Sequence, residues 1–136
     1  MGVALTRAEG NNVAKKILIV DDEEDPRTYL EALFQENGYE TGTAPDGDVA
    51  IPIAREFKPD LIVLDIIMPR ETGVKFYRQV CKDPDLKKVP VIICSGVTRY
   101  KDLFARDHAT MPKPLAFVEK PVDTKLLLAT VRNAIG

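Results

Sequence analysis

The chain has 136 residues, of which 45% are hydrophobic and 29% charged, which is the size and composition of one globular domain. Its formal net charge of −2 argues against a general binder of nucleic acid or of an anionic membrane surface. No apolar run approaches the roughly 20 residues that a membrane-spanning helix needs.

The first residues and the cysteines indicate where the protein acts. Residues 1–14 lack the apolar core of a signal peptide, and we expect them to form a flexible lead-in to a domain that covers residues 15–136. Cys81 and Cys94 are not spaced like metal ligands and are expected to be inert thiols in a reducing compartment. A cytoplasmic location is therefore expected.

Short apolar runs predict five β-strands, at residues 16–20, 39–44, 61–65, 89–94 and 115–119. The first, third and fourth runs are continuously apolar and rich in β-branched residues. This composition is typical of strands that are buried on both faces of a parallel sheet.

Helical spacing of apolar residues follows the first two strands. In the first predicted helix, Asp25 is placed to cap the amino terminus, Pro26 to occupy the first position and Gly38 to end the helix. The second helix covers residues 50–57, and Pro52 lies within it. Because proline cannot donate the backbone hydrogen bond, this helix is expected either to begin late or to be kinked.

Three more helices are predicted, around residues 74–80, 100–104 and 127–135, the last capped by Asp123. The segment 107–116 contains two prolines and is expected to be an irregular loop. Strands and helices thus alternate five times. This order predicts an α/β domain with a doubly wound parallel sheet between two layers of helices.

Polar side chains follow four of the predicted strands. Asp21 and Asp22 come after the first strand, Asp65 closes the third, Ser95 follows the fourth and Lys120 follows the fifth. In a doubly wound sheet these positions all belong to the carboxyl edge, where ligands bind. Each residue alone is an ordinary turn or cap residue. Together they predict one site.

The types of these side chains indicate the chemistry of the site. Clustered carboxylates cannot all stay ionised unless a cation offsets their repulsion. Oxygen ligands with room left for water and a phosphate oxygen favour Mg²⁺. A carboxylate beside Mg²⁺ and a lysine is suited to attack phosphorus, because both positive charges stabilise the oxygens of the transition state.

Four motifs resemble the receiver domain of two-component response regulators, here of the stand-alone, single-domain type. They are "ILIVDDEE", "LIVLDIIMPRETG", "VIICSG" and "FVEKP", and the similarity covers roughly residues 15–135 in the expected order. The resemblance implies a flavodoxin-like (βα)5 fold whose five parallel strands lie in the order 2-1-3-4-5.

The resemblance also implies a role for each residue of the acidic site. Asp65 would accept the phosphoryl group. Asp22, Asp65 and the backbone carbonyl of Ile67 would ligate Mg²⁺, for which Mn²⁺ can substitute. Asp21 would hold the ion through water, and Lys120 would pair with the phosphoryl group.

The same resemblance identifies two switch residues and two positions at which this sequence differs from the usual residue of the family. Ser95 would hydrogen-bond the phosphoryl group in place of the commoner threonine, and Phe117 would be the rotameric switch. Gly96 stands where alanine is usual and opens space in the pocket. Ile67 and Val97 would flank the path of the hydrolytic water, and because both are apolar we expect slow loss of the phosphoryl group.

The predicted function is that of a signalling phosphoacceptor rather than an enzyme. A histidine kinase or histidine phosphotransfer protein would supply the phosphoryl group. A protein target would bind the face formed by the fourth helix, the fifth strand and the last helix, with no role for nucleic acid or membrane. Two alternatives are a Mg²⁺-dependent phosphohydrolase with an aspartyl-phosphate intermediate and a non-phosphorylated receiver-like binding module. The first lacks an acid–base residue near Asp65, and the second would be expected to lack an acid or the lysine.

Overall fold

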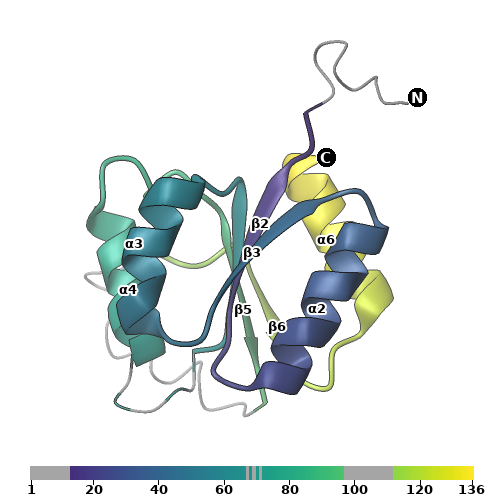
Figure 1. Cartoon of the computed structure of the whole chain (residues 1–136), viewed down its shortest axis with the longest axis horizontal. Helices are drawn as coiled ribbons and strands as arrows, with labels where there is room; N and C mark the ends of the chain where they lie inside the picture. The colour runs from purple at the N-terminus through teal and green to yellow at the C-terminus, as the bar shows by residue number, and fades with distance from the viewer. Residues whose placement is uncertain (1–12, 67, 69, 71, 97–111) are drawn as a thin grey trace.

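The computed structural model describes residues 13–66, 68, 70, 72–96 and 112–136 (Figure 1). Five strands lie in this part of the chain, each within two residues of its predicted range. They are β2 (Lys16–Val20), β3 (Glu40–Ala44), β4 (Leu61–Leu64), β5 (Val91–Ser95) and β6 (Ala116–Glu119).

The strands form one parallel sheet in the order β3-β2-β4-β5-β6. In succession along the chain this is the order 2-1-3-4-5, so the predicted flavodoxin-like topology is confirmed. The order reverses between β2 and β4, which pair in register from Ile17 with Leu61 to Val20 with Leu64. The ends of these two central strands therefore lie side by side at the carboxyl edge.

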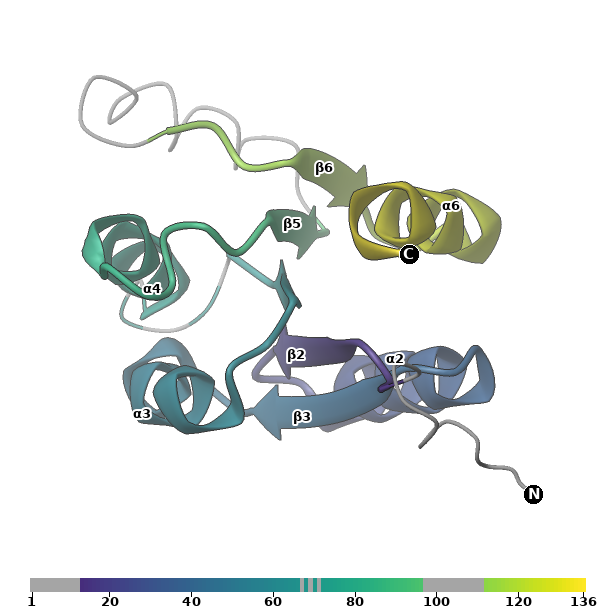
Figure 2. The same cartoon turned by 90° about the horizontal axis from the view of Figure 1, so that it is seen from above.

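Four described helices cover the two faces of the sheet (Figure 2). Helices α2 (Glu24–Glu36) and α6 (Thr124–Ile135) lie on one face, and α3 (Gly47–Phe57) and α4 (Thr72–Lys82) on the other. Alternate residues of β2 enter different cores, because strand side chains point to opposite faces in turn. Ile17 and Ile19 pack on the α2–α6 side, whereas Leu18 and Val20 pack on the α3–α4 side. None of the described helices is long and apolar enough to cross a membrane.

Helix α2 begins earlier than the sequence predicts. Its N-cap is Glu23 and not Asp25, and no side chain caps it. The early start follows from Asp21, whose Oδ1 accepts a hydrogen bond from the Glu23 N–H at 2.9 Å and turns the chain into the helix. Pro26 then occupies the third helical position. Proline is tolerated there because the first four N–H groups of a helix have no partner within it.

Helix α3 runs through Pro52 and does not begin late. The carboxylate of Asp46 accepts a hydrogen bond from the Val49 N–H at 3.0 Å and caps the helix one turn earlier than the apolar pattern indicates. Pro52 is exposed, so water can satisfy the carbonyl group that loses its partner. Of the two outcomes that the sequence left open, a late start is wrong.

The other helix predictions have different outcomes. Helix α4 contains the predicted residues 74–80, and α6 is capped by Asp123, whose carboxylate accepts from the Leu126 N–H at 3.1 Å. Both predictions are confirmed. The helix predicted around residues 100–104 and most of the loop predicted at 107–116 lie outside the described residues.

Two glycines bring α3, α4 and the end of β4 together, backbone against backbone. A Cβ atom on Gly47 would overlap the carbonyl oxygen of Thr72. A Cβ atom on Gly73 would lie 2.8 Å from the carbonyl oxygen of Asp65 and 2.7 Å from that of Ile66. The hydroxyl of Thr72 is buried here and accepts a hydrogen bond from the Gly47 N–H at 3.3 Å. The backbone just after the predicted phosphoacceptor therefore has no room to move toward α4.

We predict that Gly47→Ala destabilises the domain by about 2–3 kcal/mol, because the methyl group must displace backbone rather than a flexible side chain. Helix propensity alone predicts that the substitution stabilises the domain, since alanine is favoured over glycine in a helix by up to ~1 kcal/mol. Urea unfolding monitored by circular dichroism measures the difference.

The matched control for this substitution is Gly96→Ala. Among the described residues other than its chain neighbours, the Cβ of Lys120 would lie nearest to a Cβ atom on Gly96, at 3.9 Å. This variant should stay within about 0.5 kcal/mol of the parent. Equal stability of the Gly47 variant and the parent would contradict the packing argument.

Candidate functional site

The carboxyl edge of the sheet brings the predicted acids together. Asp21 follows β2 and Asp65 follows β4, and backbone bonds continue the sheet ladder to both of them. The Asp65 N–H donates to the carbonyl of Val20 at 2.8 Å, and the Asp21 N–H donates to that of Ala44 at 3.1 Å. Both acids are buried, with Asp21 2% and Asp65 6% exposed. The sheet itself thus positions the two carboxylates.

Asp22 completes a group of three carboxylates. One carboxylate oxygen from each of Asp21, Asp22 and Asp65 lies within 4.8 Å of the other two. Asp22 is exposed, so the cluster opens to solvent on one side. Oxygen donors at this spacing, with open positions for water, fit the coordination of a hard divalent cation such as Mg²⁺ or Mn²⁺.

Lys120 supplies the positive charge of the site. Its Nζ donates a hydrogen bond to Oδ2 of Asp21 at 2.9 Å and lies 3.6 Å from Oδ2 of Asp65. Burial lowers the pKa of this ammonium, but the hydrogen bond to Asp21 and the charge of Asp65 outweigh burial, so the net pKa of Lys120 is raised. The lysine therefore stays charged and offsets part of the repulsion between the acids.

Ser95 ends β5 beside the lysine. Its backbone carbonyl accepts from the Lys120 N–H at 2.8 Å, which ties the ends of β5 and β6 together. The Ser95 hydroxyl is fully buried and has no hydrogen-bond partner among the described residues. A buried hydroxyl without a partner is costly, and a ligand that accepts or donates a hydrogen bond here would relieve that cost.

Of the other residues with a predicted switch or hydrolysis role, the structure describes Phe117 and Gly96. Phe117 lies on β6, opposite Ile93 of β5, and packs half-buried against the α3–α4 core. Gly96 is exposed and borders Lys120. Ile67 and Val97 lie outside the described residues, so the predicted carbonyl ligand and the two flanks of the water path have no described geometry.

Sequence reasoning missed Arg27, one of the residues that hold the site. Its Nη1 donates a hydrogen bond to the backbone carbonyl of Asp21 at 2.7 Å, which anchors the acidic turn to α2. The turn itself had a signal in the sequence, because an aspartate often accepts from the N–H two residues later, as Asp21 does from Glu23. The sequence has no comparable pattern that predicts the contact of Arg27 with the Asp21 carbonyl. Thr72 and Gly73, which pack at the end of β4, were also missed.

The comparisons with known proteins decide the family. The family model of the response regulator receiver domain matches residues 17–132. The chain belongs to this family. It is 34% identical over 126 residues to Protein PilH of Pseudomonas aeruginosa, covering 88% of this chain and 96% of that protein. It is 32% identical over 121 residues to Protein Rrf1 of Nitratidesulfovibrio vulgaris, covering 89% of this chain and 83% of that protein.

Solved receiver structures share the fold. The chemotaxis response regulator CheY4 of Vibrio cholerae matches with a TM-score of 0.77 at 27% identity, covering 90% of this chain and all of that one. The signal receiver domain of a histidine kinase from Syntrophus aciditrophicus matches with a TM-score of 0.78 at 29% identity, covering 90% of each chain. The receiver family thus accounts for both the topology and the acidic pocket, which in receiver domains generally binds Mg²⁺.

We predict that Mg²⁺ stabilises this receiver through the three carboxylates. Binding to the folded state alone adds about 1.4 kcal/mol when the free ion is at ten times its dissociation constant. Thermal unfolding followed with increasing MgCl₂ should show the melting temperature rise. In Asp22→Ala most of that rise should be lost, because one ligand and one negative charge are removed.

Asp25→Ala is the matched control, since it removes another exposed acid, in the neighbouring helix, that is not in the cluster. Its response to MgCl₂ should equal that of the parent. A full response in Asp22→Ala would place the ion elsewhere.

Proposed function

We propose that this receiver accepts a phosphoryl group on Asp65 from a phosphohistidine of a histidine kinase or a histidine phosphotransfer protein. The observation that carries the proposal is the placement of Asp65: a nearly buried carboxylate, 3.6 Å from the Lys120 ammonium and grouped with two further carboxylates. A carboxylate in this setting can act as a nucleophile toward phosphorus. The ammonium beside it can stabilise the negative charge of the phosphoryl oxygens as the new bond forms.

In the proposed step, an Oδ atom of Asp65 attacks the phosphorus of the phosphohistidine. The new bond joins that oxygen to phosphorus while the phosphorus–nitrogen bond breaks, and its electron pair stays on the imidazole nitrogen, which then takes up a proton. Lys120 moves its ammonium from the two carboxylates toward the transferred oxygens. Mg²⁺, held by Asp21, Asp22, Asp65 and the Ile67 carbonyl, would neutralise charge on the phosphoryl oxygens.

The hydroxyl of Ser95 supports the signalling half of the proposal. It is buried without a partner among the described residues and lies at the strand end next to Lys120. We propose that it donates a hydrogen bond to the phosphoryl group, and that Phe117 on the neighbouring strand changes rotamer with it. Phosphorylation then shifts the equilibrium between two conformations of the domain. A protein target recognises the favoured conformation at the face formed by the helix predicted around residues 100–104, β6 and α6.

This mode of action is that of a phosphoacceptor in the cytoplasm that assists its own phosphotransfer and slow dephosphorylation. A phosphohydrolase of this kind would need a general acid or base within a few positions after Asp65 in the chain. Its described neighbours Ile66 and Met68 are instead buried hydrophobic residues, which disfavours that alternative. A binding module without phosphorylation is disfavoured because both the acids and the lysine are present.

We predict that Asp65 is the sole acceptor. Incubation with acetyl phosphate and MgCl₂ should add the mass of one phosphoryl group to the parent chain, and Asp65→Asn should abolish this gain. The amide keeps the size of the side chain, so the circular dichroism spectrum and cooperative unfolding should be retained. Asp22→Asn is a useful companion, since it should slow the gain without removing its site. A persistent gain in Asp65→Asn would refute the assignment.

We further predict that the phosphoryl group is lost slowly, a hypothesis that rests on the sequence. Ile67 and Val97 cannot orient a water molecule by hydrogen bonding, and poor orientation costs an order of magnitude or more in rate, about 1.4 kcal/mol per tenfold. The double replacement of Ile67 by Asn and of Val97 by Glu should accelerate decay, measured by the loss of the added mass after removal of the phosphodonor. Decay that is unchanged or slower would refute the hypothesis.

A further inference from the structure

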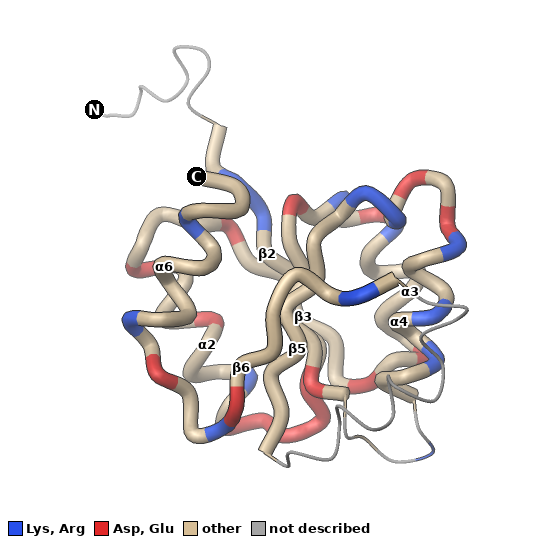
Figure 3. Tube along the Cα trace, turned by 180° about the vertical axis from the view of Figure 1, so that it is seen from behind, with Lys and Arg blue, Asp and Glu red and all other residues tan. Residues whose placement is uncertain are grey.

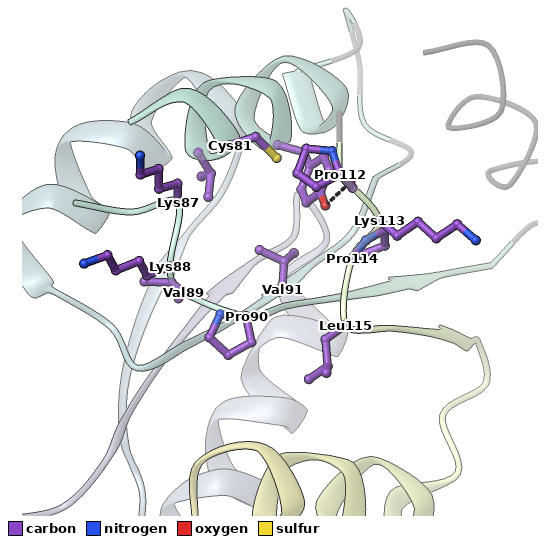
Figure 4. Close-up of a pocket in the computed structure, with 12 residues that line it drawn as sticks. Cys81, Lys87, Lys88, Val89, Pro90, Val91, Pro112, Lys113, Pro114 and Leu115 are labelled. Atoms are coloured by element: carbon purple, nitrogen blue, oxygen red, sulfur yellow. Dashed lines mark hydrogen bonds between the residues drawn. The ribbon is translucent and has the colours of Figure 1, made fainter. Parts of the chain in front are cut away.

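A second pocket lies at the amino edge of the sheet, away from the acidic site. It has a volume of about 260 Å³ and is bounded by the second half of α4, the segment 87–91 that leads into β5, and the segment 112–115 that leads into β6. Figure 4 shows Cys81 of α4 on one side of this space, Pro112 and Leu115 on another, and Val91 at its floor.

The pocket exists because the chain segments before β5 and β6 separate. Pairing of the two strands begins only where Ile92 meets Ala116, with the Leu115 N–H donating to the Val91 carbonyl at 2.8 Å just before it. Further toward the amino edge, Pro90, Pro112 and Pro114 have no N–H with which to extend the ladder. The separated segment is held in place from α4, since the Tyr77 hydroxyl donates to the Pro112 carbonyl at 2.7 Å.

The lining of the pocket is mixed, with apolar side chains in its walls and polar and positively charged groups around them. Its walls include Val80, Val89 and Val91, and burial raises the pKa of the Cys81 thiol, which keeps it neutral. Leu115 is 47% exposed, one of few large hydrophobic residues of the described chain that face solvent to this extent. Valine walls beside an exposed leucine give an apolar anchor of a partner a place to bind.

Three lysines surround this hollow and give it its charge. Lys87, Lys88 and Lys113 are all exposed, and none forms an ion pair with another residue that the structure describes. In Figure 4, Lys87 and Lys88 extend on one side of the pocket and Lys113 on the opposite side. The nearby Asp83 does not neutralise them, because its carboxylate pairs with Arg55 at 3.0 Å.

The same features disfavour a small inorganic anion as the occupant. The ammonium groups stand on opposite sides and do not converge on one point, and the prolines of the pocket offer no backbone N–H to a phosphate oxygen. Charge complementarity instead fits an extended segment that carries acids on both sides of an apolar residue.

We propose that this amino-edge pocket, lined by α4 and residues 87–91 and 112–115, docks an acidic peptide segment of a partner protein through a central apolar anchor. Figure 3 shows acidic residues along the carboxyl edge, whereas the opposite edge beside α3 and α4 carries Lys and Arg residues interspersed with acidic ones. Because the pocket shares no residue with the acidic site, the partner could bind while Asp65 is engaged, and the proposal does not depend on the proposed phosphotransfer.

The test is a titration of the ¹⁵N-labelled full chain, followed by two-dimensional NMR. The probes are the peptide acetyl-EDLFDE-amide, the peptide acetyl-KKLFKK-amide with the same apolar centre, and single-stranded hexathymidylate. We expect saturable shifts with the acidic peptide, concentrated in residues 77–81, 87–91 and 112–115. The basic peptide should give none of these shifts.

Two charge-reversal variants distinguish binding at this pocket from general electrostatic attraction to a basic surface. The double variant Lys87→Glu, Lys113→Glu should bind the acidic peptide about tenfold or more weakly at low ionic strength. The matched double variant Lys75→Glu, Lys125→Glu changes the net charge equally at exposed lysines outside the pocket, and should bind within about twofold of the parent. Circular dichroism checks that both variants fold.

Three outcomes would overturn the proposal. They are the absence of saturable shifts with the acidic peptide, shifts that map elsewhere, and equal weakening in the two double variants. Shifts in the same residues with hexathymidylate and not with the peptide would reject the protein partner in favour of nucleic acid.

Discussion

The repulsion between carboxylates at the carboxyl edge is the constraint on which the rest of the structure depends. Asp21 and Asp65 are nearly buried, where the interaction between charges is stronger than in water. Lys120, within 2.9 Å of one and 3.6 Å of the other, offsets part of that repulsion. The cation comes from the edge strand β6 and the acids from the central strands, so the site exists only when the whole sheet has assembled.

The surrounding packing gives this site a rigid base. The acids stand at the ends of strands, where backbone hydrogen bonds to Val20 and Ala44 hold them. Gly73 allows α4 to approach the carbonyl of Asp65, and no side chain separates them. A site supported by backbone contacts keeps its geometry when charge is added, so the response is directed to the groups that can move. We propose that Lys120 and the Ser95 hydroxyl, which has no hydrogen-bond partner among the described residues, are the groups that respond.

The two edges of the sheet carry different groups of side chains. The carboxyl edge collects acids and one lysine, and suits a cation and a phosphoryl group. The amino edge has a pocket with valine walls between exposed lysines, where we propose that an acidic segment binds. The parallel arrangement causes this separation, because every strand presents its carboxyl end to the same edge. A receiver of this size thus has room for two kinds of contact that do not compete for the same residues.

The sequence by itself determined the strands, the topology and the identity of the acidic site. Apolar runs and helical spacing are local patterns, and the four receiver motifs place Asp21, Asp65 and Lys120 on one edge. The tertiary structure decided what depends on distant contacts. The turn at Asp21 moved the start of α2 from the predicted Asp25 cap to Glu23, and Arg27 was seen to hold that turn. The close approach of α3 to α4 also had no local signal, because it joins Gly47 to Thr72, which are 25 residues apart in the sequence, and only the folded chain brings them into contact.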